Sequence, residues 1–189
     1  LTDMAMVSRL GAIALAATGM GSLLLWVIMS MGIGLRTAVQ TVTSRRLGQK
    51  LFPECGHALH NGVILSVILA IPATLLGTYY SVGIAELFLQ DPEVIPQCAN
   101  YLYVGFYGIC FVLTGFSFQG FYTGIEQAKI HMKVTIVSNI INVYLNAGLI
   151  YGTDGVTRFF EKIGLPWIAV LWQWYDFPAM AVKGAALAT

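Results

Sequence analysis

The stretch Val134–Thr153 reads VTIVSNIINVYLNAGLIYGT and contains no Asp, Glu, Lys or Arg. Three other stretches also lack these residues: Leu10–Leu35, Cys55–Ala85 and Val94–Ile125. A helix needs about 20 mostly apolar residues to cross a bilayer, and each stretch is at least that long. Four such stretches predict an integral membrane protein. We expect it to be all-α, a polytopic bundle of membrane helices, because a helix satisfies its own backbone hydrogen bonds in lipid.

Composition agrees with this class and excludes several functions. The chain is 57% hydrophobic and 10% charged, whereas a soluble domain has about 25% charged residues. A net charge of +1 gives no signal for nucleic acid as a partner. The cysteines Cys55, Cys98 and Cys110 are odd in number and show no CxxC spacing, so neither a disulfide framework nor a thiolate metal site is expected. No phosphate-binding loop or nucleophile elbow is present, so we expect no enzyme activity and no cofactor.

The predicted organisation follows from the spacing of these stretches. Transmembrane helices are expected at about 15–41, 59–80, 99–122 and 131–151. An acidic, proline-marked loop is expected between the second and third, at 86–96. Residues 1–11 resemble the end of a preceding helix and residues 179–189 the start of a following one. We therefore expect a fragment of a longer protein, cut inside a helix at each end.

Positive charge predicts the orientation, because Lys and Arg concentrate in cytoplasmic loops. Two connections on the same side are basic, and they carry Arg45, Arg46, Lys50, Lys129 and Lys133. These connections are expected to face the cytoplasm from a plasma membrane, or from the inner membrane of a bacterium. The opposite face then carries Arg9, Asp91 and the long connection at 154–178.

That connection is rich in aromatic residues, which favour the boundary between lipid and water. They are Phe159, Phe160, Trp167, Trp172, Trp174 and Tyr175. An interfacial helix is one interpretation and a lid over a substrate is the other. In either case Gly164–Trp167, Gly-Leu-Pro-Trp, is expected to break the segment into two pieces.

The asparagines of the last stretch are candidates for function, because polar side chains at membrane depth are costly and often functional. Asn142 and Asn146 are four residues apart and share one helix face, and Asn139 lies close to that face. They either form hydrogen bonds between helices or contribute oxygen ligands to an ion site. Asp3 is either a loop cap or a membrane carboxylate that binds a cation or a proton.

Two other patterns give weak signals. The segment Glu54–His60 has Glu, Cys and two His at spacings that superficially resemble a metal site, but no matching partners stand elsewhere in the chain. Gly120 and Gly124 form a Gly-x-x-x-Gly pattern that favours close packing of helices.

Several blocks of the chain, in order, resemble the multidrug and toxic compound extrusion (MATE) transporters. The blocks are Thr2–Gly11 (TDMAMVSRLG), Ala14–Ala17 (ALAA), Gly34–Gln40 (GLRTAVQ), Arg46–Gly48 (RLG), Ile141–Asn146 (INVYLN), Ile150–Gly152 (IYG) and Val182–Thr189 (VKGAALAT). No single block is specific, but together they cover nearly the whole chain.

The resemblance implies a transporter of twelve helices in two six-helix lobes, of which this chain is most of the N-terminal lobe and lacks the C-terminal lobe. It implies antiport, in which Na⁺ or H⁺ enters and an amphipathic, often cationic compound leaves. Carried over residue by residue, the family's N-lobe cation site falls on Asp3, Asn142, Asn146, Thr189 and the carbonyl of Ala185.

Some residues depart from the family pattern. Asn146 stands where some relatives have an acid, so Asp3 is the one evident carboxylate and a single ion is favoured, without a choice between Na⁺ and H⁺. The connection between Thr153 and Lys183 is longer than the family pattern predicts.

Two alternatives remain. A flippase for lipid-linked sugars on a related fold would favour a cavity rich in Arg and Lys, but the predicted spans contain only Arg36 and, at the start of 131–151, Lys133. A membrane scaffold without transport activity gives no reason for an Asp and an Asn-x-x-x-Asn pair.

Overall fold

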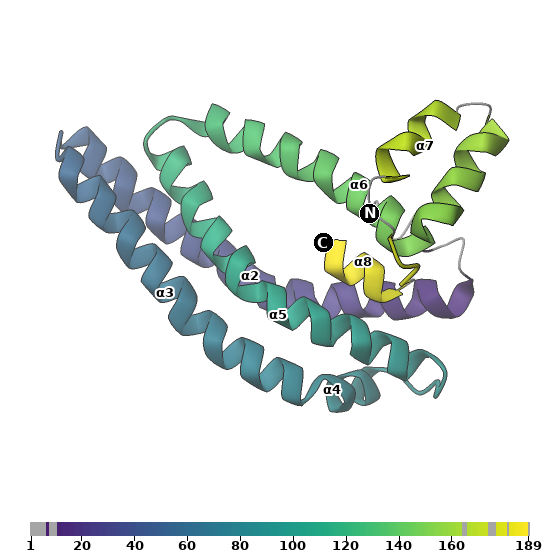
Figure 1. Cartoon of the computed structure of the whole chain (residues 1–189). Coiled ribbons are helices and arrows are strands. Elements are labelled where there is room, and N and C mark those ends of the chain that lie inside the picture. The colour runs from purple at the N-terminus through teal and green to yellow at the C-terminus, as the bar shows by residue number, and fades with distance from the viewer. Residues whose placement is uncertain (1–6, 8–10, 164–165, 174–176, 181, 189) are drawn as a thin grey trace. The chain divides into compact units, whose positions relative to one another are not determined.

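The computed structural model describes residue 7 and residues 11–163, 166–173, 177–180 and 182–188. Its helices are α2 (Ala12–Gly48), α3 (Phe52–Tyr79), α4 (Ser81–Phe88), α5 (Val94–Gly124), α6 (Ala128–Ile163), α7 (Pro166–Gln173) and α8 (Val182–Ala188) (Figure 1). No strand occurs among these residues. The predicted all-α class is confirmed.

Four helices are long and apolar enough to cross a membrane: Ala12–Gly48, Phe52–Tyr79, Val94–Gly124 and Ala128–Arg158. The predicted spans 15–41, 99–122 and 131–151 lie inside α2, α5 and α6, and 59–80 passes the end of α3 by one residue. The helices extend beyond the apolar spans into polar residues, such as Arg45 and Arg46 in the last turn of α2. The chain is an integral membrane protein.

One unit of the chain comprises Leu23–Tyr80 and Phe106–Ser138. In it, parts of α2 and α5 pack with α3 through small residues. The hydroxyl oxygens of Ser66 and Ser117 are 2.8 Å apart, and Ser66 Oγ also donates to the carbonyl of Leu113 at 3.2 Å. These bonds join α3 to α5 without a large side chain between them.

The Gly120–Gly124 pattern lies at the contact of α5 with α2 in this unit. A Cβ at Gly120 would overlap the backbone of Arg36 and would lie 3.2 Å from the Cα of Arg36. A Cβ at Gly124 would lie 2.8 Å from the Cβ of Thr43. Ser44 Oγ donates to the carbonyl of Gly124 at 3.2 Å. The predicted role of these glycines in close helix packing is confirmed.

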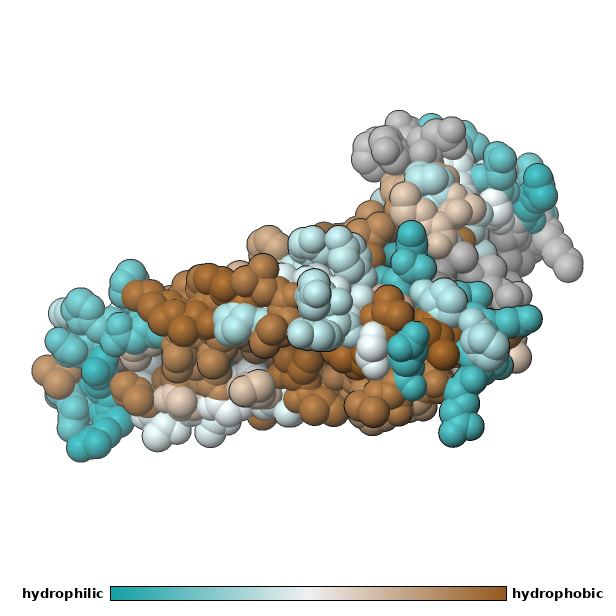
Figure 2. Space-filling model, turned by 90° about the horizontal axis from the view of Figure 1, so that it is seen from below, coloured by the Kyte–Doolittle hydropathy of each residue, from teal (hydrophilic) through white to brown (hydrophobic). Residues whose placement is uncertain are grey.

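The surface of this unit matches a lipid environment. Figure 2 shows apolar residues along the flank of the long helices and hydrophilic residues at the end that carries the α2–α3 turn. The exposed large apolar side chains of α2 and α3 include Leu23, Trp26, Val27, Met31, Ile68, Leu75 and Leu76. Exposure of such a band costs little in lipid and a great deal in water.

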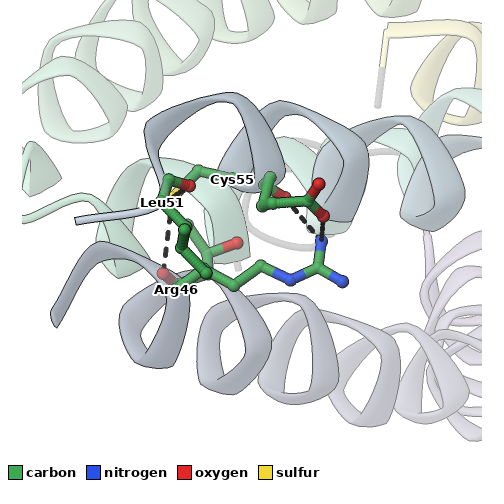
Figure 3. Close-up of polar contacts among 5 residues, drawn as sticks. Arg46, Leu51 and Cys55 are labelled. Carbon is green, nitrogen blue, oxygen red and sulfur yellow. Dashed lines mark hydrogen bonds and ion pairs between the residues drawn. The ribbon is translucent and has the colours of Figure 1, made fainter. Parts of the chain in front are cut away.

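The α2–α3 turn is closed by polar contacts (Figure 3). The amide of Leu51 donates to the carbonyl of Arg46 at 3.0 Å, and Cys55 Sγ donates to the carbonyl of Leu51 at 3.6 Å. Arg46 Nη1 lies 3.7 Å from Glu54 Oε2. An exposed ion pair of this kind contributes at most about 1 kcal/mol, so the turn depends mainly on its backbone bonds.

The other unit comprises residues 1–22, 81–105 and 139–189. Part of the predicted acidic loop is helical here, since α4 includes Glu86. Loop structure remains around Asp91, whose Oδ1 accepts from the amide of Glu93 at 2.9 Å and whose carbonyl accepts from the amides of Val94 and Ile95 at the start of α5.

Helix α6 bends in this unit at Gly152, which has φ 72° and ψ 168°. This backbone region is accessible essentially only to glycine. After the bend the helix continues to Ile163, and α7 begins at Pro166, so the segment is divided into two helical pieces as expected. The connection is therefore built of helices that follow a sharp bend.

Candidate cation site

The amide pair lies on α6, before the bend. Asn146 Nδ2 donates to Asn142 Oδ1 at 3.0 Å, so the two side chains meet across one helical turn. Asn146 is completely buried and Asn142 is half-buried, whereas Asn139 is exposed. The expectation that Asn142 and Asn146 share a face is confirmed, and Asn139 is outside the pair.

Both side chains carry amide oxygens, which can bind a cation. An Asn side chain has two donor hydrogens and one carbonyl oxygen that accepts two bonds. The bond within the pair uses one hydrogen of Asn146 and one lone pair of Asn142. Burial of an amide is unfavourable unless its polar atoms are bonded. The bond to Asn142 therefore holds the buried amide group of Asn146 in one orientation on a membrane-spanning helix. A fixed polar group of this kind is suited to an ion site.

Helix α8 packs against α6 next to the pair. The amide of Met180 donates to the carbonyl of Leu149 at 2.8 Å. A Cβ at Gly184 would overlap that same carbonyl group, lying 2.6 Å from its carbon. Leu149 is three residues after Asn146, on the same side of α6. Ala185, the next residue of α8, is completely buried.

Of the five predicted site residues, Asn142, Asn146 and Ala185 lie in one unit of the structure. Asp3 and Thr189 lie outside the described residues. Thr18, a buried polar residue that the sequence reasoning missed, belongs to the same unit, and its hydroxyl donates to the carbonyl of Ala14 within α2.

The segment Glu54–His60 does not gather around one point. Glu54 pairs with Arg46, and Cys55 Sγ lies 3.7 Å from the carbonyl of Thr43. Within the described part of the chain, no group of three His, Cys, Asp or Glu side chains is placed to hold a metal ion.

Comparison with known proteins identifies the family. A family model described as MatE matches residues 1–147. This chain belongs to the MatE family. The resemblance to MATE transporters is confirmed, and the relatives that it matches are transporters rather than enzymes.

The chain is similar to several bacterial proteins. It is 25% identical over 168 residues to the probable multidrug resistance protein NorM of Synechocystis sp., covering 89% of this chain and 35% of that protein. It is 28% identical over 159 residues to NorM of Burkholderia vietnamiensis, covering 84% and 34%. It is 29% identical over 170 residues to the probable multidrug resistance protein YoeA of Bacillus subtilis, covering 87% and 35%. The chain thus spans about a third of the length of these relatives.

Solved structures share the fold. A MOP superfamily transporter from Pyrococcus furiosus matches with a TM-score of 0.79 at 21% identity, over 100% of this chain and 36% of that one. An outward-facing multidrug resistance MATE family transporter matches with 0.79 at 21%, over 99% and 36%. An inward-facing one matches with 0.73 at 21%, over 99% and 40%. The MatE chain described here therefore corresponds to about one lobe of such a transporter.

Proposed function

We propose that the full-length protein is a secondary antiporter that exports amphipathic, often cationic drugs or metabolites in exchange for Na⁺ or H⁺. The observation that carries this proposal is the hydrogen-bonded amide pair of Asn142 and Asn146, the second completely buried, on a membrane-spanning helix of a MatE member. The multidrug resistance names of its relatives support the same substrate class. The protein acts in the plasma membrane, with its C-terminal lobe completing the substrate path.

The coupling site that we propose consists of Asp3, Asn142, Asn146, Thr189 and the carbonyl of Ala185. One carboxylate with neutral oxygens forms a site whose charge changes by one when a cation binds. Hard oxygen ligands suit Na⁺, and a desolvated carboxylate takes up a proton instead. Because a bare anion is unfavourable in a low-dielectric interior, Asp3 has a strong tendency to bind either ion.

Ion binding acts on transport through the packing of helices. The proposed site brings Asp3 together with residues of α6 and α8, so its occupancy changes how strongly these segments hold together. A ligand shifts a conformational equilibrium by as much as its affinity differs between the two states. Loading with Na⁺ or H⁺ thereby favours one direction of opening of the lobe.

Ethidium efflux from cells that express the full-length protein tests this proposal, with Na⁺ present and absent. We expect wild-type efflux to depend on the cation, and Asp3→Asn to abolish efflux at equal expression. Asn146→Leu is expected to abolish it as well, whereas the matched control Asn139→Leu, at an exposed position of the same helix, retains it. Full efflux from Asp3→Asn and Asn146→Leu would refute the cation site, and absence of efflux from the wild type would refute the antiporter.

A further inference from the structure

The end of α7 and the segment 177–180 contact α6 over the two turns around the amide pair and the bend. We propose that Trp172 is a positioning residue of the cation site: with Tyr144 and Phe177 it forms an aromatic clamp that fixes the shape of α6 and so the place of Asn142 and Asn146. This inference rests on the proposed function and adds to it a role for the long connection.

The clamp is made of specific contacts. The rings of Tyr144 and Trp172 stack with centroids 4.8 Å apart and planes 21° apart, and Phe177 meets Tyr144 edge-on at 6.1 Å. Trp172 Nε1 donates to the carbonyl of Tyr144 at 2.9 Å, and the hydroxyl of Tyr144 donates to the carbonyl of Leu171. Both polar ends of the stack are therefore bonded, and Trp172 and Phe177 are buried.

A small residue on α6 makes room for the clamp. A Cβ at Gly148 would lie 3.0 Å from the ring of Phe177 and 3.1 Å from the ring of Trp172. Val156, beyond the bend, belongs to the same buried cluster as Trp172 and Phe177. The connection thus packs on both sides of the bend at once.

The bend itself is held by an exchange of hydrogen bonds. In an unbroken helix the amide of Thr153 would donate to the carbonyl of Leu149. Here Thr153 donates to the carbonyl of Phe177 at 3.2 Å, and Leu149 accepts from Met180 at 2.8 Å. The amide of Phe177 also donates to Thr153 Oγ1 at 2.9 Å. The segment 177–180 supplies every partner that the bend requires at these two positions.

The clamp and the amide pair occupy opposite faces of the same turns. At about 100° per residue, Tyr144 lies about 200° around the helix from both Asn142 and Asn146. The bond from Met180 to Leu149 also fixes the start of α8, which carries Ala185. Phe177 of the clamp and Met180 belong to the same four-residue segment, so the clamp sets both the orientation of the amides and the register of α8 beside them. Its loss changes the ion site although Trp172 does not contact the ion.

The test compares Trp172→Phe with Trp167→Phe in the full-length protein. Trp172→Phe keeps an aromatic ring in the cluster but removes the donor to Tyr144. Trp167, on the same helix, is 69% exposed, so the same change there is the matched control. Tyr144→Phe, which removes only the hydroxyl, is a second variant should Trp172→Phe express poorly.

Two quantities are measured. The first is the cation concentration at half-maximal ethidium efflux, from a Na⁺ titration at constant pH and a pH titration without Na⁺. The second is hydrogen exchange at the amides of Thr153 and Met180 in the purified protein. We expect Trp172→Phe to raise the half-saturating concentration and to speed exchange by about two- to ten-fold each, the range for loss of one hydrogen bond, at an unchanged maximal rate. Trp167→Phe should change neither quantity.

The outcomes separate this inference from the proposed function. Unchanged exchange in both Trp172→Phe and Tyr144→Phe overturns the clamp, whatever the protein transports. Faster exchange with an unchanged half-saturating concentration, or a fall in maximal rate alone, shows a purely structural role and overturns the positioning inference. Absence of cation-dependent efflux from wild-type cells, with faster exchange in Trp172→Phe, overturns the proposed function and with it the link to the ion.

Discussion

Gly184→Ala is expected to push α8 away from α6 and weaken the cation site. A Cβ at this position would lie 2.6 Å from the carbonyl carbon of Leu149 and 3.1 Å from the amide nitrogen of Ile150, whereas ordinary contact begins at 3.4 Å. The obstacle is backbone, which no side-chain rotation removes. The helices must separate by most of an ångström, and the bond from Met180 to Leu149, now 2.8 Å long, must stretch with them.

The size of the effect follows from two opposing terms. Overpacking of a close contact costs about 1–3 kcal/mol, and replacement of glycine by alanine inside a helix returns about 0.5–1 kcal/mol. The net loss therefore lies between about 0 and 2.5 kcal/mol of stability, centred on about 1 kcal/mol. If the substitution destabilises the ion-bound state by about 1 kcal/mol more than the ion-free state, the half-saturating cation concentration rises about five-fold.

Gly115→Ala is the matched control, because a Cβ at Gly115 on α5 meets no atom within 4 Å. That variant gains only the helix term and should be as stable as wild type or more so. Thermal unfolding of the purified full-length proteins in detergent measures the first effect, and cation-dependent ethidium efflux measures the second. The reasoning is refuted if Gly184→Ala unfolds at the same temperature as Gly115→Ala with the cation dependence of wild type.

Three further predictions concern other parts of the chain. Gly120→Ala should lower stability by about 1–3 kcal/mol, since its Cβ would overlap the backbone of Arg36; thermal unfolding beside Gly115→Ala checks this. Gly152→Ala should cost about 1–3 kcal/mol because the combination of φ 72° and ψ 168° is accessible essentially only to glycine, and a melting temperature equal to wild type contradicts it. Vesicles that contain only these 189 residues should accumulate no dye under an ion gradient, and any accumulation would show that the second lobe is dispensable.

The membrane helices could be predicted from sequence because the bilayer imposes a simple rule of length and polarity. The pairing of Asn142 with Asn146 could be predicted as well, because a spacing of four residues determines which side chains meet on a helix. Both predictions depend only on residues that are close together in the sequence. The placement of Asp3 and Thr189 beside the pair remains a prediction, which rests on family resemblance.

The bend at Gly152 and the contacts of the connection could not be predicted in this way. Trp167 and Trp172 stand in one short helix, yet Trp167 is 69% exposed and Trp172 is 7% exposed. Their difference comes from Tyr144, which is 28 residues before Trp172 and whose carbonyl accepts its Nε1 proton. The position of the connection at the lipid–water boundary stays a prediction, but the burial of Trp172 against α6 could not be read from its sequence. Helix α4 was missed because eight residues are too few for a periodic pattern to stand out.

The bend also gives the end of the long connection a structural role. A bend in a membrane-spanning helix frees backbone groups, and each unbonded group in lipid costs several kcal/mol. The carbonyl of Leu149 and the amide of Thr153 are bonded here by Met180 and Phe177, which come from beyond α7. The chain extends through the rest of α6 and α7 before it returns to these two positions. The segment 177–180 therefore satisfies the backbone groups that the bend frees beside the amide pair.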